Sequence, residues 1–108
     1  MNGRSAVAFL DDRALVRDAV CCRVRATHPT MGGFAIVIVN ISAQGLMARC
    51  EKALSEGDRL DVTLPIVGRT GAVIRWSLGG RIGCELDHVI SLSDYYLLLS
   101  EMLKATPR

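Results

Sequence analysis

Aromatic residues and long hydrophobic runs are both scarce in this chain, and each scarcity argues against a class of protein. The 108 residues include one Trp, two Tyr and two Phe. Small barrels that bind single-stranded nucleic acid stack successive bases on aromatic side chains, which this chain can hardly supply. The longest apolar run, residues 34–39, is far shorter than the roughly 20 residues of a membrane-spanning helix. We therefore expect no DNA or RNA partner and no membrane insertion.

An excess of charge and the common catalytic motifs are also missing. Thirteen basic and eleven acidic residues give a net charge of +2, too small to indicate a polyanion partner but compatible with a local basic site. The chain has no glycine-rich phosphate loop and no nucleophile elbow. His28 and His88 are isolated in the sequence, and Glu85 and Asp87 share a strand face without an evident partner. We expect no enzymatic activity.

Four cysteines are present, but their spacing does not indicate a metal site or a disulfide framework. Cys21, Cys22, Cys50 and Cys84 form no C-x-x-C pair, and no His stands at ligand spacing from them. Cys21 and Cys22 would point to opposite faces of a strand. With no convincing secretory signal, the thiols indicate a reducing compartment, and we expect a cytoplasmic protein without a bound metal.

The rest of the sequence is typical of one small β-rich domain. Its hydrophobic content of 50% suits a compact core. Turn residues separate six expected strands at residues 20–28, 34–41, 46–50, 59–64, 72–78 and 81–86. Gly79 and Gly80 form a two-residue hairpin signal. Alternation places Ala72, Ile74 and Trp76 on one face of their strand. Several short strands at such spacing indicate a barrel.

A single helix is expected at the end of the chain. Ser91 or Ser93 can cap it, and an aspartate follows in its first turn. Helical spacing creates one apolar face, made of Tyr95, Leu98, Leu99, Met102 and Leu103. We expect this face to be docked on the barrel or on a partner.

Two short motifs stand at the edges of the expected strands. Arg13 and Arg17 form an R-x-x-x-R spacing before the first strand, and Asn40, Ser42 and Gly45 form N-x-S-x-x-G after the second. Each motif alone has a plain explanation. The first can be a solvated charged face, and the second a turn in which Asn and Ser bond the backbone and Gly takes a positive φ.

Together, in this order and separation, the motifs resemble those of the PilZ family. The similarity covers residues 12–104 and includes Gly57-Asp58 before an alternating strand, a strand that ends in Trp76, and the Gly83-Cys-Glu-Leu86 strand. It implies a mainly β fold, a small six-stranded antiparallel PilZ-type β-barrel with a C-terminal α-helix.

The resemblance also implies the limits of the domain. Residues 1–11 would be an N-terminal arm, residues 12–104 the PilZ-like domain, and residues 105–108 a frayed tail.

The function that the resemblance implies is that of a receptor for the bacterial second messenger cyclic di-GMP, which relays its level to a downstream protein. It implies a ligand but no cofactor. The implied ligand-binding residues are Arg13, Arg17, Asn40, Ser42, Gly45 and Trp76. The chemistry is suitable, since a guanidinium can grip a phosphate with two bonds and can pair with guanine O6 and N7.

A second function remains open, that of a degenerate PilZ-type domain that binds proteins and not the nucleotide. The entry segment lacks the third arginine of many members, and Asn40 offers guanine fewer acceptors than aspartate would. The helix face of Tyr95, Leu99 and Met102 would suit protein binding if it is exposed. A monomer and a weak homodimer are both compatible with the sequence.

Overall fold

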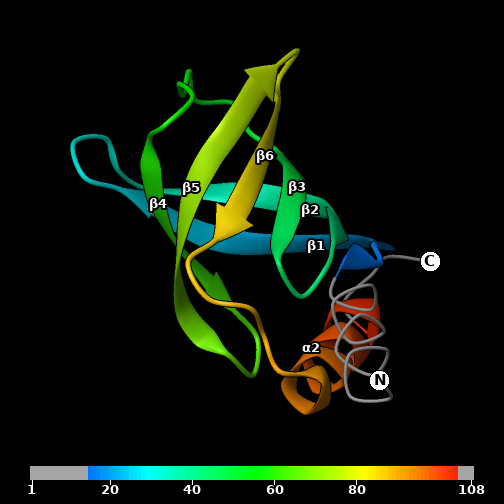
Figure 1. Cartoon of the computed structure of the whole chain (residues 1–108). Coiled ribbons are helices and arrows are strands. Elements are labelled where there is room, and N and C mark those ends of the chain that lie inside the picture. The colour runs from blue at the N-terminus through cyan, green and yellow to red at the C-terminus, as the bar shows by residue number, and fades with distance from the viewer. Residues whose placement is uncertain (1–14, 105–108) are drawn as a thin grey trace, which may run out of the picture.

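In the part of the chain that the structure describes, the strands close into a barrel with a helix beside it (Figure 1). A computed structural model describes residues 15–104. Its elements are β1 (Asp18–His28), β2 (Gly32–Ile41), β3 (Gly45–Arg49), β4 (Arg59–Leu64), β5 (Gly68–Leu78), β6 (Arg81–Leu86) and α2 (Leu92–Lys104). The hydrogen-bonded order around the barrel is β1-β2-β3-β6-β5-β4, and every pair is antiparallel. The predicted six-stranded antiparallel barrel with a C-terminal helix is confirmed.

The largest boundary difference is at the start of β5. The segment 65–71 was expected to be a turn, but Gly68 already pairs with Leu64 of β4. Gly68 has a φ of 83° and Ile66 a φ of 65°, so the chain reverses direction within a few residues. The residues after Gly68 are therefore free to extend the β4–β5 ladder.

Alternating side chains of all six strands fill the barrel. Val24 and Ala26 of β1 are buried, while Arg23 and Arg25 between them are exposed. Strands β2 to β6 contribute most of the largest fully buried aliphatic side chains, among them Ile36, Ile38, Leu46, Leu60, Val62, Ile74 and Ile82. Because these side chains fill the interior, the outer surface and the strand ends are the places where a ligand can bind.

Trp76 lies on the outer face of the barrel, so the prediction that it shares a face with Ala72 and Ile74 was wrong. The β5–β6 register shifts between Ile74 and Trp76, which marks a β-bulge. Trp76 pairs with Gly83, and a Cβ on Gly83 would overlap the indole ring. The extra residue in the bulge turns the Trp side chain outward, where it is 39% exposed.

Helix α2 begins at a serine cap and packs its apolar face on the barrel. The Ser91 hydroxyl accepts the backbone N–H of Asp94 at 3.3 Å. Tyr95, Leu98 and Met102 are buried, whereas Leu103 is half exposed. The helix face is therefore docked on its own barrel, and Tyr95 and Met102 are too buried to form the protein-binding face considered for the second function.

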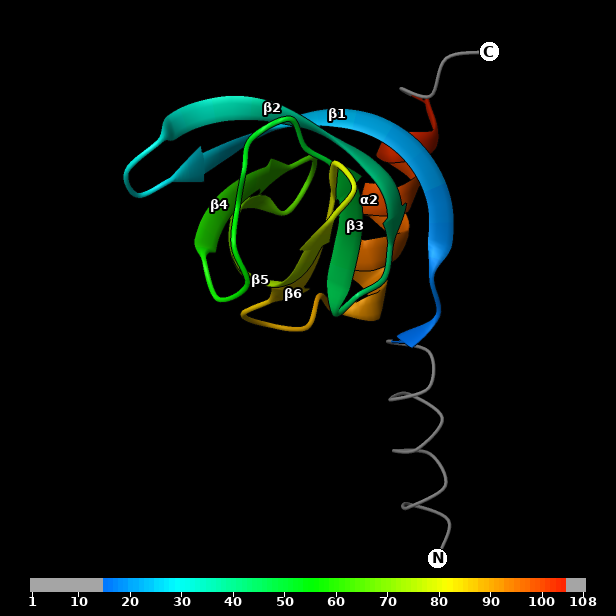
Figure 2. The ribbon, with the colours of Figure 1, turned by 90° about the horizontal axis from the view of Figure 1, so that it is seen from above.

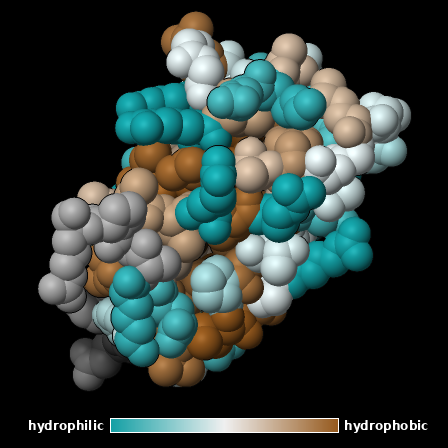
Figure 3. Space-filling model, turned by 180° about the vertical axis from the view of Figure 1, so that it is seen from behind, coloured by the Kyte–Doolittle hydropathy of each residue, from teal (hydrophilic) through white to brown (hydrophobic). Residues whose placement is uncertain are grey.

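The view from above shows which parts of the chain lie outside the barrel (Figure 2). The β1–β2 hairpin extends sideways beyond β4, and α2 lies against the barrel beside β1. Seen from behind, the surface is a mosaic of hydrophilic and hydrophobic residues (Figure 3). Within residues 15–104, no helix has the length and apolarity to span a membrane.

Candidate functional site

Arg17, immediately before β1, is held beside the end of β2. Its Nη1 donates a hydrogen bond to Oδ1 of Asn40 at 2.8 Å. The amide nitrogen of Asn40 in turn points to the Met47 sulfur of β3 at 3.6 Å. Asn40 therefore positions the Arg17 guanidinium and uses its own oxygen to do so. Arg13, the other arginine of the motif, lies outside the described residues.

The Ser42 hydroxyl stabilises the turn between β2 and β3. It accepts the backbone N–H groups of Gln44 and Gly45, both at 3.2 Å, and the side chain is only 3% exposed. The backbone N–H of Ser42 donates to the Gly45 carbonyl at 2.8 Å. The serine thus shapes a tight turn whose backbone borders the site, a common use of serine next to a turn.

Gly45 has a structural reason to be glycine that the sequence did not reveal. A Cβ at this position would overlap the carbonyl oxygen of Cys84 on the neighbouring β6. The φ of Gly45 is not in the left-handed region. Close packing of β3 against β6 therefore requires the glycine, because any larger side chain would push the two strands apart.

These residues surround one open pocket on the outside of the barrel. Its volume is about 420 Å³. The lining comprises Leu15, Arg17, Ser42, Gln44, Gly45, Arg75, Trp76, Gly83, Cys84 and Glu85. Four of the six residues nominated from the sequence line it, and Asn40 contacts it through Arg17. The motif before β1, the β2–β3 turn and the bulge of β5 thus converge although they are far apart in sequence.

The sequence analysis missed two charged members of this pocket. Arg75 Nε donates to Glu85 Oε1 at 2.8 Å, so Glu85 has a partner and is not a bare strand end. Both side chains are more than half exposed, so the pair can open at little cost when a ligand competes for it. Pairing residues outward from the two-residue Gly79-Gly80 turn would have predicted that Trp76 is opposite Gly83. The bulge between Ile74 and Trp76 has no sequence signature, so the positions of Arg75 and Glu85 could not be predicted.

The pocket combines groups that suit a planar, anionic ligand. Arg17 and Arg75 carry positive charge, and the Trp76 ring provides a flat, partly exposed surface. The β2–β3 turn contributes Ser42, Gln44 and Gly45 to the lining. Burial, and secondarily the neighbouring Cys50 thiol, raises the pKa of Cys84 to about 12, so this thiol stays protonated and is no nucleophile.

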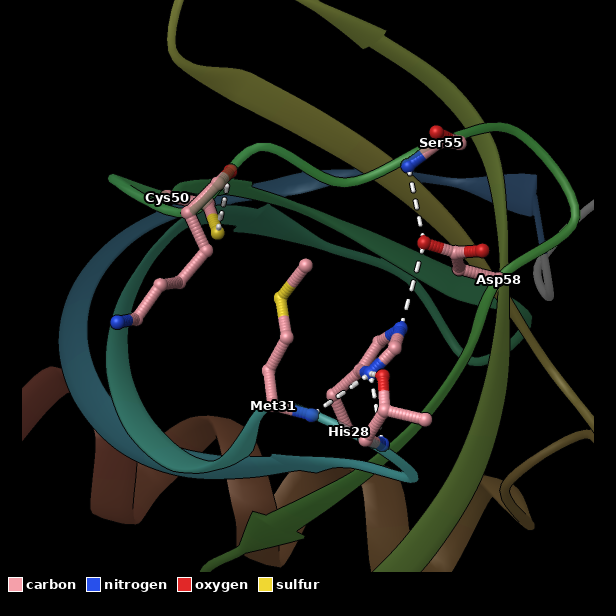
Figure 4. A network of polar contacts seen from close by, with 7 residues as sticks. His28, Met31, Cys50, Ser55 and Asp58 are labelled. Carbon is pink, nitrogen blue, oxygen red and sulfur yellow. Dashed lines mark hydrogen bonds and ion pairs between the residues drawn. The ribbon is translucent and has the colours of Figure 1, made fainter.

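A second polar cluster joins the β1–β2 turn to the segment before β4 (Figure 4). His28 Nδ1 accepts the backbone N–H groups of Thr30 and Met31, and Nε2 lies 3.4 Å from an Asp58 oxygen. The same Asp58 oxygen accepts the backbone N–H of Ser55 at 3.0 Å. The sequence suggested that His28 is isolated, but in the structure it is part of this cluster. Both ring nitrogens are used to hold loops together.

Asp87 also has a partner, since its carboxylate binds the Arg59 guanidinium. All four cysteines are free thiols: Cys21 is exposed, and Cys22, Cys50 and Cys84 are buried. The opposite orientation of Cys21 and Cys22 is as expected. Within residues 15–104 there is no group of three or more Cys, His, Asp or Glu side chains arranged to hold a metal ion.

Comparison with known proteins agrees with the geometry. The family model of the PilZ domain matches residues 10–103. A solved structure of the PilZ domain of CeSA from a cellulose-synthesizing bacterium has the same fold, with a TM-score of 0.57 and 13% sequence identity. That similarity covers 82% of this chain and 96% of the other. None of the curated proteins matches the chain. The barrel, the converging motifs and the family match together place this chain in the PilZ domain family.

Proposed function

We propose that this protein binds cyclic di-GMP in the pocket between Arg17, the β2–β3 turn and Trp76, and that binding is relayed to a partner protein. PilZ domains are generally cyclic di-GMP receptor modules and typically have no catalytic activity. The observation that carries the proposal is the convergence of three separate sequence segments on one pocket, with Arg17 already oriented by Asn40.

Arginine supplies the main recognition chemistry. The Arg17 guanidinium can bind a phosphate or the O6 and N7 edge of a guanine. Arg13, in the preceding segment, would add a second guanidinium with the same binding capacity. Arg75 can exchange its contact with Glu85 for a phosphate. Because Asn40 restricts Arg17 before the ligand arrives, less side-chain entropy is lost on binding.

Trp76 and the turn supply the rest of the site. The indole ring can stack on a guanine, and the backbone beside Ser42 and Gly45 lies at the pocket wall. Ser42 contributes through the turn that it holds rather than through a free hydroxyl. Replacing it would therefore change the position of the pocket wall.

The test is isothermal titration of the folded protein with cyclic di-GMP. Arg17→Ala should weaken binding by about 10- to 100-fold, because a hydrogen bond to a charged group contributes about 1.5–3 kcal/mol. The control is Arg69→Ala, which removes the same charge from an exposed side chain that pairs with Asp61. It should bind like the unmodified protein.

A flat titration of the folded, unmodified protein would contradict the proposal. So would equal losses of affinity in Arg17→Ala and Arg69→Ala, because the effect would then come from net charge alone. The flat titration would favour a domain that binds only proteins, whereas equal losses would show that the nucleotide is not bound through Arg17.

A further inference from the structure

We propose that a second site, separate from the nucleotide pocket, binds an acidic, extended segment of a partner protein. The segment would add as a strand to the free edge of β2 at Phe34–Ile36. Its acidic side chains would meet the arginines of β1, β3 and β6. This proposal does not depend on nucleotide binding.

The first observation is that half of β2 has a strand on one side only. Residues Gly32–Ile41 of β2 pair with β1 along nearly their whole length. Pairing with β3 begins only at Val37, which is opposite Arg49, the last residue of β3. No hydrogen bond within residues 15–104 takes the place of β3 beside Phe34–Ile36. This edge offers backbone donors and acceptors to an incoming strand.

The free edge opens into a groove of about 780 Å³. Phe34, Ala35, Ile36 and Val37 form one side of it. The loop after β3 and the β5–β6 turn form the other, with residues 49–52 and 79–81. The thiol of Cys50 donates to the Lys52 carbonyl at 3.7 Å, and the backbone N–H of Cys50 donates to the Gly80 carbonyl at 2.9 Å (Figure 4). The far wall is thus held in place.

The second observation is a row of arginines across the outer face of the barrel next to this edge. The strand register places Arg23 opposite Val37, Val37 opposite Arg49, and Arg49 opposite Arg81. Residues opposite each other in neighbouring strands project to the same face, so the three arginines share one face. All three line the groove together with Lys52, and Glu51 is the one acidic residue there.

None of these four cations is neutralised within residues 15–104. The ion pairs there use His28, Arg59, Arg69, Arg75 and Lys104 instead. Arg49 and Arg81 are directly opposite each other on neighbouring strands, and like charges in this position repel, which costs folding stability without a benefit inside the domain. The arrangement is explained if an anionic partner compensates them.

The free edge decides between a peptide and other anions. A strand edge presents both N–H and C=O groups, and only a polypeptide backbone satisfies both in regular order. The phosphates of a nucleic acid backbone or of a lipid surface can only accept. The groove also lacks an exposed aromatic ring for stacking bases, since Phe34 is buried.

The geometry places acidic side chains within reach of the arginines. An added strand beside Phe34–Ile36 continues the path of β3 beyond Arg49. Its residue opposite Ala35 projects to the outer face, as Ala35 and Arg25 do, and the small Ala35 side chain leaves room for it. Alternate residues of an extended chain are about 7 Å apart and share a face. A peptide with acids at alternate positions therefore fits the surface.

The experiment measures fluorescence anisotropy of a labelled synthetic peptide in which glutamate alternates with valine. We expect saturable binding to the nucleotide-free protein that weakens as salt is added. Arg49→Gln plus Arg81→Gln should weaken it by about tenfold or more, because two charge-assisted contacts are lost. The control, Arg69→Gln plus Lys104→Gln, lowers the net charge equally and should bind normally, as should Arg17→Ala.

Changes in the peptide test the added strand directly. The same peptide with N-methyl groups at alternate residues cannot donate to the β2 edge and should bind at least about tenfold more weakly. In NMR spectra, the amide signals of residues 34–36 should shift with the unmethylated peptide. The melting temperature of the Arg49→Gln, Arg81→Gln protein should not fall, which excludes unfolding as the cause of lost binding.

Several results would overturn the proposal. The proposal is wrong if a glutamine–valine peptide or the N-methylated peptide binds the unmodified protein as tightly as the glutamate–valine peptide does. It is also wrong if the two double variants bind the glutamate–valine peptide equally well. Tighter binding of an oligothymidine, or of vesicles of anionic phosphatidylglycerol, would assign the groove to nucleic acid or to a membrane instead. None of these results would bear on cyclic di-GMP binding in the other pocket.

Discussion

Cys84 lies where the core of the barrel meets the wall of the nucleotide pocket, and its ionisation depends on folding. Burial raises the pKa of its thiol to about 12, whereas a thiol in an unfolded chain ionises near pH 8.5. Between these two values the unfolded chain loses a proton that the folded protein keeps. The folded state is therefore destabilised as the pH rises through this interval.

We predict that the urea midpoint falls as the pH is raised from about 8.5 to about 11. Cys84→Ala should reduce this dependence, because one group that ionises only on unfolding has been removed. Denaturation curves at several pH values, followed by circular dichroism under reducing conditions, provide the measurement. Parallel pH dependences of the two proteins would contradict the assigned cause.

Single residues also show how far the sequence alone could lead. Arg17, Ser42, Gly45 and Trp76 were nominated from motifs, and all four line one pocket. The role of each residue within the pocket could not be predicted from the motifs. The reason for Gly45 is the approach of β6, which no local pattern encodes.

At the scale of elements, the ends of α2 illustrate a choice that the sequence left open. Both Ser91 and Ser93 could have been the cap. The Ser91 hydroxyl accepts the Asp94 N–H, and the Ser91 carbonyl accepts the Tyr95 N–H at 2.8 Å. Ser91 thus precedes the first turn and has the geometry of an N-cap.

Ser91→Ala should therefore lower the free energy of unfolding by about 1 kcal/mol, the usual cost of losing an N-cap side chain. Ser93→Ala, a change of the same size inside the first turn, should cost clearly less. Urea denaturation of both variants measures the difference. A larger loss in Ser93→Ala would show that the cap is assigned to the wrong serine.

The β5–β6 pair shows where prediction of elements stops. Both strands were expected from alternation, and β6 was placed correctly at residues 81–86. The bulge between Ile74 and Trp76 was not expected, because it adds one residue without changing the pattern of turn residues. The orientation of Trp76 and the Arg75–Glu85 pair both depend on it.

At the scale of the whole molecule, the Tyr95 hydroxyl links the helix to two strands of the barrel. Tyr95 donates towards Asp18 Oδ2 at 2.6 Å and towards the Ile41 carbonyl at 3.0 Å. These acceptors lie at the start of β1 and the end of β2. The residue thus fixes the helix at the point of the barrel from which Arg17 and the β2–β3 turn extend.

Tyr95→Phe should destabilise the protein by about 1–3 kcal/mol, because the buried Ile41 carbonyl and the partly buried Asp18 carboxylate lose their donor. Tyr96→Phe, on a half-exposed ring of the same helix, is the matched control and should cost less. The measurement is the free energy of unfolding in urea. Equal losses in both variants would show that the Tyr95 hydroxyl does not anchor the helix.

The free edge of β2 has a consequence for how copies of this protein meet in solution. An uncovered strand edge tends to pair with the same edge of another copy, which is a common route to aggregation. Here Arg23, Arg49 and Arg81 stand beside the edge and would face their counterparts at close range. We expect this repulsion to oppose edge-to-edge pairing of identical chains, and the same charges to favour an acidic strand. The arginine row would then select partners by the sign of their charge.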